Sequence, residues 1–278
     1  MDQATVATAY EHITLPVLGI LPTALVLLAL LPIFAILGFL SGRARRERQI
    51  ADGKDIEQLI GDSSLGAILA LLGLLLAFSF GNALSLLESR KADIIAEANA
   101  LGTAFLRADY LPEPHRSELK QALYDYATTR IVEPDSPLGT RDRAIAFIER
   151  SLEAQARLWP LTLEATADPV PPPVATFVAS AINDVIDAHQ LRMRSVSVPI
   201  SELSQFIVVL AACAALFLLG NGAGLAGRKL TWRTFLFSGL LLVVMMTVID
   251  VQRASEGLIR VDQSALRATL ADMKQSLG

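Results

Sequence analysis

The sequence predicts an all-α integral membrane protein with four transmembrane helices and a helical extramembrane bundle between the second and the third. The hydrophobic fraction is 53% and the mean hydropathy is +0.46 over 278 residues, which is too apolar for an ordinary soluble chain. Four apolar runs are long enough to cross the hydrocarbon core of a bilayer, and charged residues concentrate between residues 88 and 200. No stretch alternates with period two for long enough to indicate a strand.

The first two spans are predicted over residues 15–40 and 64–87, after an N-terminal segment of residues 1–14. The second span has no charged side chain before Glu88. The charged stretch that follows it contains no proline and no glycine until Gly102, and its apolar residues keep helical spacing. We therefore expect one long helix that leaves the bilayer without a break.

Two further spans are predicted over residues 201–220 and 234–250. The connections form two short basic loops, residues 41–63 with four arginines and one lysine, and residues 221–233 with three basic residues and no acid. The positive-inside rule places both loops in the cytoplasm. The N-terminus, the 88–200 region and the C-terminus would then face outward.

The 88–200 region predicts antiparallel helices interrupted by prolines. The segment Leu111-Pro-Glu-Pro114 should end the long helix, and the proline-rich segment 168–173 should act as a stiff spacer. Residues 251–278 predict a terminal amphipathic helix. Its narrow apolar stripe (Leu266, Leu270, Met273 and Leu277) is typical of a coiled-coil seam or of a helix packed on a bundle.

The sequence predicts no catalytic, cofactor or metal centre, and no enzyme. Gly222-Ala-Gly-Leu-Ala-Gly227 fits G-x-G-x-x-G, but a membrane span precedes it where phosphate binding would require a strand, so a flexible connection is expected. Asp184 and Asp187 share a helical face that His189 does not, which favours solvated polar residues over a cation site. No strip of basic and aromatic residues indicates nucleic-acid binding. The single cysteine, Cys213, is expected to be a small buried hydrophobe.

Small and polar residues recur along the second span, at every fourth position from Gly73 to Ser85. Such faces let helices approach closely in lipid, so packing against another span or subunit is one interpretation. The other is that they border a narrow aqueous path, with Phe78 or Phe80 as an apolar constriction. The candidate residues are Gly73, Ala77, Phe78, Ser79, Phe80, Gly81, Asn82 and Ser85.

Charged residues are expected where the spans meet water. The candidates are Glu88, Arg192, Arg194, Asp250, Arg253 and Arg260. Charges near lipid are costly unless they are paired. We therefore expect the group after the fourth span, beginning at Asp250, to pair with Arg192, Arg194 or Glu88.

Five short motifs follow one another along the chain. They are the basic connection from Arg43 to Asp62, Glu88 with Glu97-Ala-Asn-Ala-Leu101, Leu111-Pro-Glu-Pro114 before a helix ending in Tyr124-Asp-Tyr126, Arg192-x-Arg194 ahead of Pro199, and Asp250 with Gly257-Leu-Ile-Arg-Val261. In these motifs the chain resembles the bacterial bestrophin-like domain family, which is distantly similar to bestrophin anion channels. The family pattern Asp-Leu-Asp-Arg-Pro is kept only in part, since Gln252 and Ala254 replace its second Asp and its Pro.

The resemblance implies a homo-oligomer of the bacterial inner membrane, a pentamer in bestrophins, that conducts small ions through a pore lined by the second span. The expected ions are anions. The resemblance also implies a cytoplasmic 88–200 region, opposite to the orientation that the charge count favours and that we expect here. The alternative function is a non-conducting structural or signalling membrane protein whose extramembrane region binds a partner. A ring with an open axis would favour the channel, and a dimer with the second span sealed against its mate would favour the alternative.

Overall fold

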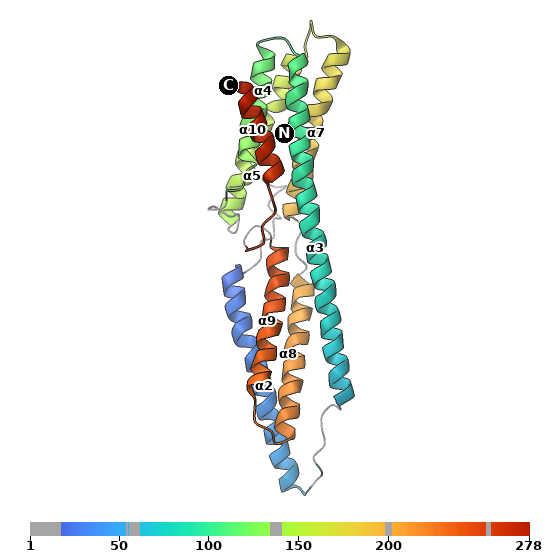
Figure 1. The fold of residues 1–278 in the computed structure, drawn as a ribbon, viewed down its shortest axis with the longest axis vertical. Helices are drawn as coiled ribbons and strands as arrows, with labels where there is room; N and C mark the ends of the chain where they lie inside the picture. Colours follow the sequence, from blue (N-terminus) through green and yellow to red (C-terminus); the bar gives the residue numbers. More distant parts are fainter. Residues whose placement is uncertain (1–17, 54, 56–61, 134–140, 198–201, 254–256) are drawn as a thin grey trace.

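The computed structural model describes residues 18–278 except 54, 56–61, 134–140, 198–201 and 254–256. The described residues form helices and no strand, which confirms the predicted all-α fold. Figure 1 shows two tiers of helices along the long axis of the molecule. The helices of one tier are long and apolar. The helix α3 (Asp62–Arg107) runs through both tiers without a break.

The apolar tier, called here the membrane tier, contains four helices that are long and apolar enough to cross a membrane. They are α2 (Ile20–Ala51), the first half of α3, α8 (Glu202–Leu225) and α9 (Trp232–Gln252). Their shared core includes Leu31, Ala35 and Leu216, all fully buried. The four predicted spans are therefore confirmed as four long apolar helices, while the predicted N-terminal segment 1–14 lies outside the described residues.

Two of the predicted loops are partly helical. Helix α2 continues through all four arginines of the first loop to Ala51, and Gly53, with a φ of 67°, follows its end. Arginine, glutamate and glutamine are good helix formers, so a helix can project beyond the lipid without a break. Helix α8 likewise extends to Leu225, and Gly227, with a φ of 68°, ends it in the left-handed conformation that glycine adopts readily.

Glycines hold α2 and α8 in direct backbone contact. A Cβ atom added to Gly220 would lie 2.0 Å from the carbonyl oxygen of Ala35, and one added to Gly38 would lie 2.0 Å from that of Phe217. Gly42 and Gly224 make similar approaches one turn further along each helix. Small residues at four-residue spacing are what permits such packing in lipid. The flexible connection predicted for residues 222–227 is therefore wrong at its start, where the chain is helical and closely packed.

The second tier, called here the extramembrane tier, is built on the second half of α3. Its other elements are η1 (Ala108–Tyr110), α4 (His115–Thr129), α5 (Arg141–Ala156), α6 (Leu158–Ala165), α7 (Pro172–Ser197) and α10 (Ser264–Leu277). Helix α7 packs along α3, and α10 packs against both α3 and α4. The core includes Leu101, Leu123 and Ile182. Leu266 and Met273 point from α10 into the same core, so the apolar stripe of the terminal helix is covered by the bundle.

Candidate functional site

The membrane half of α3 leaves most of its surface uncovered. Only 6% of its apolar window is buried, against 39% for the windows of α8 and α9. Leu72 and Ala83 lie on the side that packs against the other spans. On the uncovered side, Gly73 and Gly81 are exposed, and a Cβ atom added to either would meet nothing within 4 Å. Within one chain, therefore, this surface is not a helix-packing contact.

Most of the sequence-predicted candidates lie on this uncovered side. Ala77, Asn82 and Ser85 are exposed. Ser79 is half-buried and stands four residues before the buried Ala83, so it belongs to the packed side of α3, contrary to the sequence prediction. We call the exposed set the α3 face. It consists of Gly73, Ala77, Phe78, Gly81, Asn82 and Ser85.

Phe78 and Phe80 cannot both point toward one pore axis. Residues two apart on a helix are separated by about 200° around it. The Phe78 side chain is 68% exposed and that of Phe80 is 39% exposed. Phe78 is therefore the better candidate for a constriction on the α3 face.

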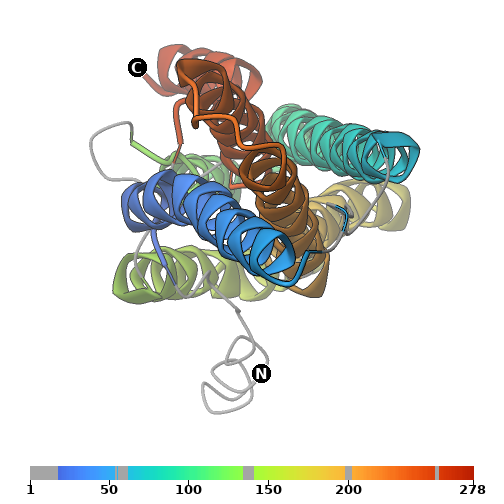
Figure 2. The ribbon, with the colours of Figure 1, turned by 90° about the horizontal axis from the view of Figure 1, so that it is seen from below.

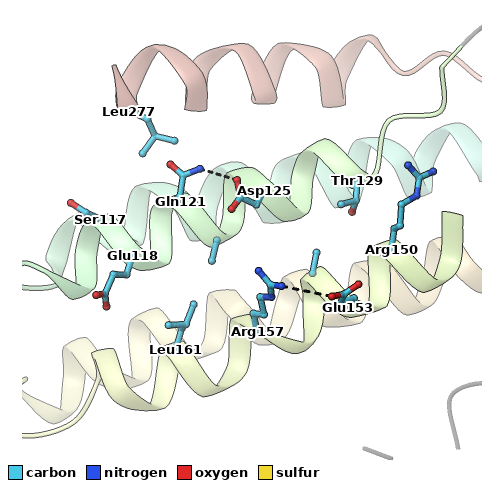
Figure 3. A pocket seen from close by; sticks show the side chains of 12 residues that line it. Ser117, Glu118, Gln121, Asp125, Thr129, Arg150, Glu153, Arg157, Leu161 and Leu277 are labelled. Carbon is cyan, nitrogen blue, oxygen red and sulfur yellow. Dashed lines mark hydrogen bonds and ion pairs between the residues drawn. The ribbon is translucent and has the colours of Figure 1, made fainter. Parts of the chain in front are cut away.

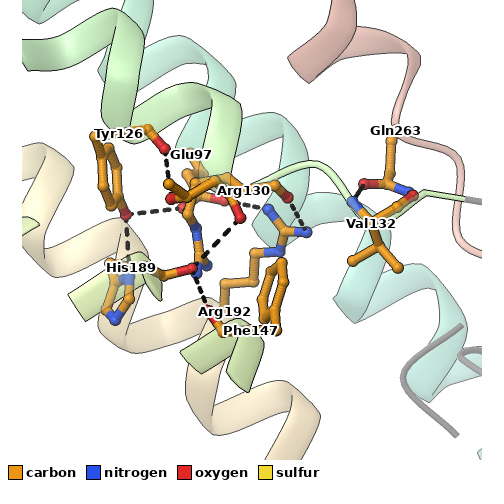
Figure 4. Close-up of polar contacts among 10 residues, drawn as sticks. Glu97, Tyr126, Arg130, Val132, Phe147, His189, Arg192 and Gln263 are labelled. Carbon is orange, nitrogen blue, oxygen red and sulfur yellow. Dashed lines mark hydrogen bonds and ion pairs between the residues drawn. The ribbon is translucent and has the colours of Figure 1, made fainter. Parts of the chain in front are cut away.

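A buried ionic network joins α3, α4 and α7 in the extramembrane tier (Figure 4). The Glu97 carboxylate, fully buried, accepts hydrogen bonds from Arg130 Nε at 2.6 Å and Arg192 Nη1 at 2.5 Å. It also accepts one from the Tyr126 hydroxyl at 3.2 Å. Tyr126 lies 3.0 Å from Nδ1 of His189, and Arg192 donates to the carbonyl oxygen of Arg130 at 3.0 Å. The network therefore fixes three helices to one carboxylate.

Charge and burial set the protonation states in this network. Burial raises the pKa of Glu97, but the charges of Arg130 and Arg192 outweigh it, so the pKa lies below its usual value and the group is ionised. Burial lowers the pKa of His189 to about 3, and the charge of Arg130 acts in the same direction. Burial raises the pKa of Tyr126. At neutral pH the network thus holds one carboxylate and two guanidinium groups.

The Arg130 side chain is fully buried, yet its two terminal nitrogens have no hydrogen-bond partner among the described residues. Its guanidinium carbon lies 5.4 Å from the centroid of the Phe147 ring and 5.9 Å from that of Tyr126. Attraction between the cation and these rings offsets part of the cost of burial. The Arg130 guanidinium is therefore stabilised by two aromatic rings as well as by Glu97.

Arg192 was expected at the membrane interface, and that prediction is wrong. Its partner Glu97 lies nine residues beyond Glu88 on α3, which is about 14 Å along the helix axis. Arg192 is 5% exposed and belongs to the bundle core. The side chain of Arg194 lies outside the described residues.

Asp250 does not pair with the charged side chains that the sequence suggested for it. The Asp250 carboxylate accepts the backbone N–H groups of Leu258 and Ile259, both at 2.9 Å. Gly257 comes so close to this carboxylate that a Cβ atom there would lie 1.8 Å from Oδ1, so no larger residue fits. Asp250 therefore fixes the loop that follows α9.

The neighbouring charges have other partners. Arg253 donates to the carbonyl oxygen of Leu18 at 2.6 Å and so ties the end of α9 to the start of α2. Glu88 and Arg260 are exposed, and Arg260 Nε lies 3.4 Å from the carbonyl oxygen of Gly257. The backbone contacts of Arg253 and Arg260 are ones that sequence spacing does not reveal.

His189 is separated from the two aspartates with which it was considered. Asp184 and Asp187 are exposed on α7, whereas His189 is 1% exposed and faces Tyr126. In the described part of the chain, no three histidine, cysteine, aspartate or glutamate side chains gather at metal-binding distance.

An open groove of about 780 Å³ lies between α4 and the α5–α6 pair (Figure 3). Its charged groups are bonded to neighbours along their own helices. Gln121 donates to Asp125 at 2.8 Å, and Arg157 pairs with Glu153 at 3.7 Å. The groove therefore shows no set of polar groups converging on a ligand.

Taken together, four apolar helices and an amphipathic helical tier joined by one continuous helix define a multi-pass helical membrane protein. The Bestrophin-like domain family model matches residues 29–266, and this chain belongs to that family. The fold is similar to that of a bacterial bestrophin homologue from Klebsiella pneumoniae, seen in a crystal structure with one tryptophan-to-alanine mutation. The TM-score is 0.57 at 13% sequence identity, over 93% of this chain and 96% of that one. No curated protein matches the chain.

Proposed function

We propose that the chain is one subunit of a ring-shaped homo-oligomer, a pentamer by analogy with bestrophins, that conducts small ions, mainly anions, across a membrane. The α3 face carries this proposal. It is exposed in the single chain, made of small and polar residues and one phenylalanine, and free of charge over the apolar half of the helix. Membership of the Bestrophin-like domain family supports the same arrangement.

In such a ring, α3 faces the central axis and the α3 face lines the pore. Glycine and alanine keep the pore narrow without closing it, and Phe78 forms an apolar constriction that gates by dewetting. Asn82 and Ser85 supply N–H and O–H donors that replace part of the hydration shell of an anion.

Glu88 lies one turn beyond Ser85 and is exposed on the same side of α3. A ring of carboxylates at this exit opposes anion entry through Coulomb repulsion. Replacing Glu88 with glutamine should therefore raise the permeability ratio of chloride to sodium in the reconstituted protein.

Two measurements test the proposal. Particle images of the purified protein should show a ring with an open axis, and planar bilayers containing it should conduct chloride. Phe78→Ala should increase the conductance by removing the constriction. Phe206→Ala, which removes a phenylalanine 63% exposed on α8, should leave the conductance unchanged.

Two outcomes would overturn the proposal. One is no conductance under any ionic condition, together with no effect of Phe78→Ala. The other is a dimer in which α3 is sealed against its mate, which would support the non-conducting structural or signalling protein instead.

A further inference from the structure

Basic side chains gather at the end of the membrane tier that lies away from the extramembrane tier. The α2 end, the connection between α8 and α9, and the start of α9 contribute Arg43, Arg45, Arg46, Arg48, Arg228, Lys229 and Arg233. Within the described residues of these segments, the only acidic side chains are Glu47, Asp52 and Asp55. Positive charge is therefore in clear excess. We call the seven residues the basic cluster.

The end of α2 touches the end of α8 and the connection that leads into α9, although these segments are far apart in the sequence. A Cβ atom added to Gly227 would lie 2.5 Å from Nη1 of Arg46, so the guanidinium rests on the turn between α8 and α9. One added to Gly224 would lie 2.7 Å from the backbone nitrogen of Arg43. Figure 2 looks at this end of the tier, with the light-blue end of α2 beside the turn that enters α9. The basic cluster is thus one surface.

The position of the cluster relative to lipid follows from the neighbouring side chains. Leu40 on α2 and Leu236 on α9 are 53% and 60% exposed, and such apolar surface suits acyl chains. Trp232, 69% exposed, is the first residue of α9, and tryptophan is enriched at the boundary between lipid and water. Arg43 lies within about one helical turn of Leu40, and Arg233 lies between Trp232 and Leu236. The basic cluster therefore lies at the level of lipid headgroups.

We propose that the basic cluster binds the phosphate of an anionic phospholipid, with the acyl chains of that lipid lying along α2 and α9. Arginine donates paired N–H groups to phosphate oxygens, and lysine adds a compact charge. A lipid with a net negative charge is favoured over a zwitterionic one because no compensating cation accompanies its phosphate. A free phosphate ion would leave the adjacent apolar surface unused. This inference is independent of conduction.

Trp232 offers a direct measurement, because it stands beside the cluster. The chain has two tryptophans, and the other, Trp159, lies in α6 of the extramembrane tier. In a Trp159→Phe background, the remaining fluorescence reports lipid at the cluster. Phosphatidylglycerol with brominated acyl chains should quench it more strongly than brominated phosphatidylcholine at equal mole fraction. Rising salt should weaken the preference, because headgroup electrostatics are screened.

Arg228→Gln with Lys229→Gln removes two exposed members of the cluster. Each basic residue near an anionic membrane surface contributes about a fivefold factor in affinity, so the preference for phosphatidylglycerol should fall by roughly 25-fold. The matched control, Arg150→Gln with Arg157→Gln, removes two exposed arginines from α5 and the residue after it, and should keep the preference.

Three results would overturn the proposal. The first is equal quenching by both lipids in the protein with all seven basic residues. The second is an unchanged preference in the Arg228→Gln, Lys229→Gln variant. The third is loss of the preference when millimolar inorganic phosphate is added at constant ionic strength, which would mean that the cluster takes free phosphate. If the double variant does not fold, the salt dependence and the two single variants decide the question.

Discussion

Glu97 on α3 and Arg192 on α7 form a buried ion pair between residues 95 positions apart, with 2.5 Å between Oε2 and Nη1. The same carboxylate also binds Arg130 of the segment that ends α4. One carboxylate therefore compensates two buried cations, and the packing of three helices depends on its charge.

We expect Glu97→Gln to lower the free energy of unfolding of the extramembrane tier by about 3–5 kcal/mol, because it leaves two buried guanidinium groups without a carboxylate. Denaturant unfolding in a Trp232→Phe background, followed by the fluorescence of Trp159, measures this change. Glu149→Gln, which alters an exposed glutamate on α5, is the control and should change the value by less than about 0.5 kcal/mol. Equal stability of the two variants would show that the network does not hold the tier together.

Stability should fall on mild acidification because of His189. Its pKa is about 3 in the folded chain, below the ordinary value of 6.5, so below pH 6.5 the unfolded chain takes up a proton that the folded chain refuses. The stabilisation is complete above pH 6.5 and is lost as pH falls toward 3, by up to about 1.4 kcal/mol per pH unit.

Denaturation between pH 7.5 and pH 5 measures this loss before most carboxylates titrate. His189→Gln should flatten the profile in that interval. The control, His115→Gln at a half-buried histidine on α4, should change the profile less. A steep profile that survives His189→Gln would assign the effect to another group.

Gly220→Ala should destabilise the membrane tier, because the new Cβ atom would lie 2.0 Å from the carbonyl oxygen of Ala35 and would push α2 and α8 apart. Overpacking of this kind costs roughly 1–3 kcal/mol. Thermal unfolding in detergent measures the effect. Gly239→Ala on α9, where a Cβ atom meets nothing within 4 Å, is the matched control and should be neutral or slightly stabilising. Similar melting curves for the two variants would contradict the observed contact.

The charge of the short connections predicts the orientation of the chain. In a Cys213→Ser background, an impermeant maleimide should label Thr128→Cys on α4 from outside intact cells. It should label Lys229→Cys only in inverted vesicles. Both positions are exposed. The reverse pattern would give the cytoplasmic extramembrane region that the resemblance to bestrophins implies.

The four apolar helices and the unbroken α3 could be predicted from the sequence, because span length and the absence of helix breakers are local properties. The ends of the loops could not. The arginines after Leu40 are good helix formers, but the sequence does not show where their helix ends or what it packs against. Gly224 and Gly227 supply a contact for it from a distant part of the sequence.

The partners of the charged residues show the same limit. Arg192 precedes a span by several residues, a position that favours the membrane boundary. Its helix α7 runs beside α3, however, so that Arg192 binds Glu97. Small residues at four-residue spacing occur on α2, α8 and α3, but only those on α2 and α8 meet within the single chain. Gly38 with Gly42 and Gly220 with Gly224 make the close contact, while Gly73 and Gly81 remain uncovered. Spacing alone identifies faces that permit close approach, but not which two of them meet.

The unbroken α3 helix has a mechanical consequence. From Glu97 to Gly73 it is a rod of about 36 Å, with no proline along that length to act as a joint. A tilt of about 5° at the ionic network would displace the level of Gly73 by roughly 3 Å, the width of a water molecule. A ligand or protein that tilts α3 by shifting α4 or α7 would therefore move the α3 face by about the diameter of a small ion.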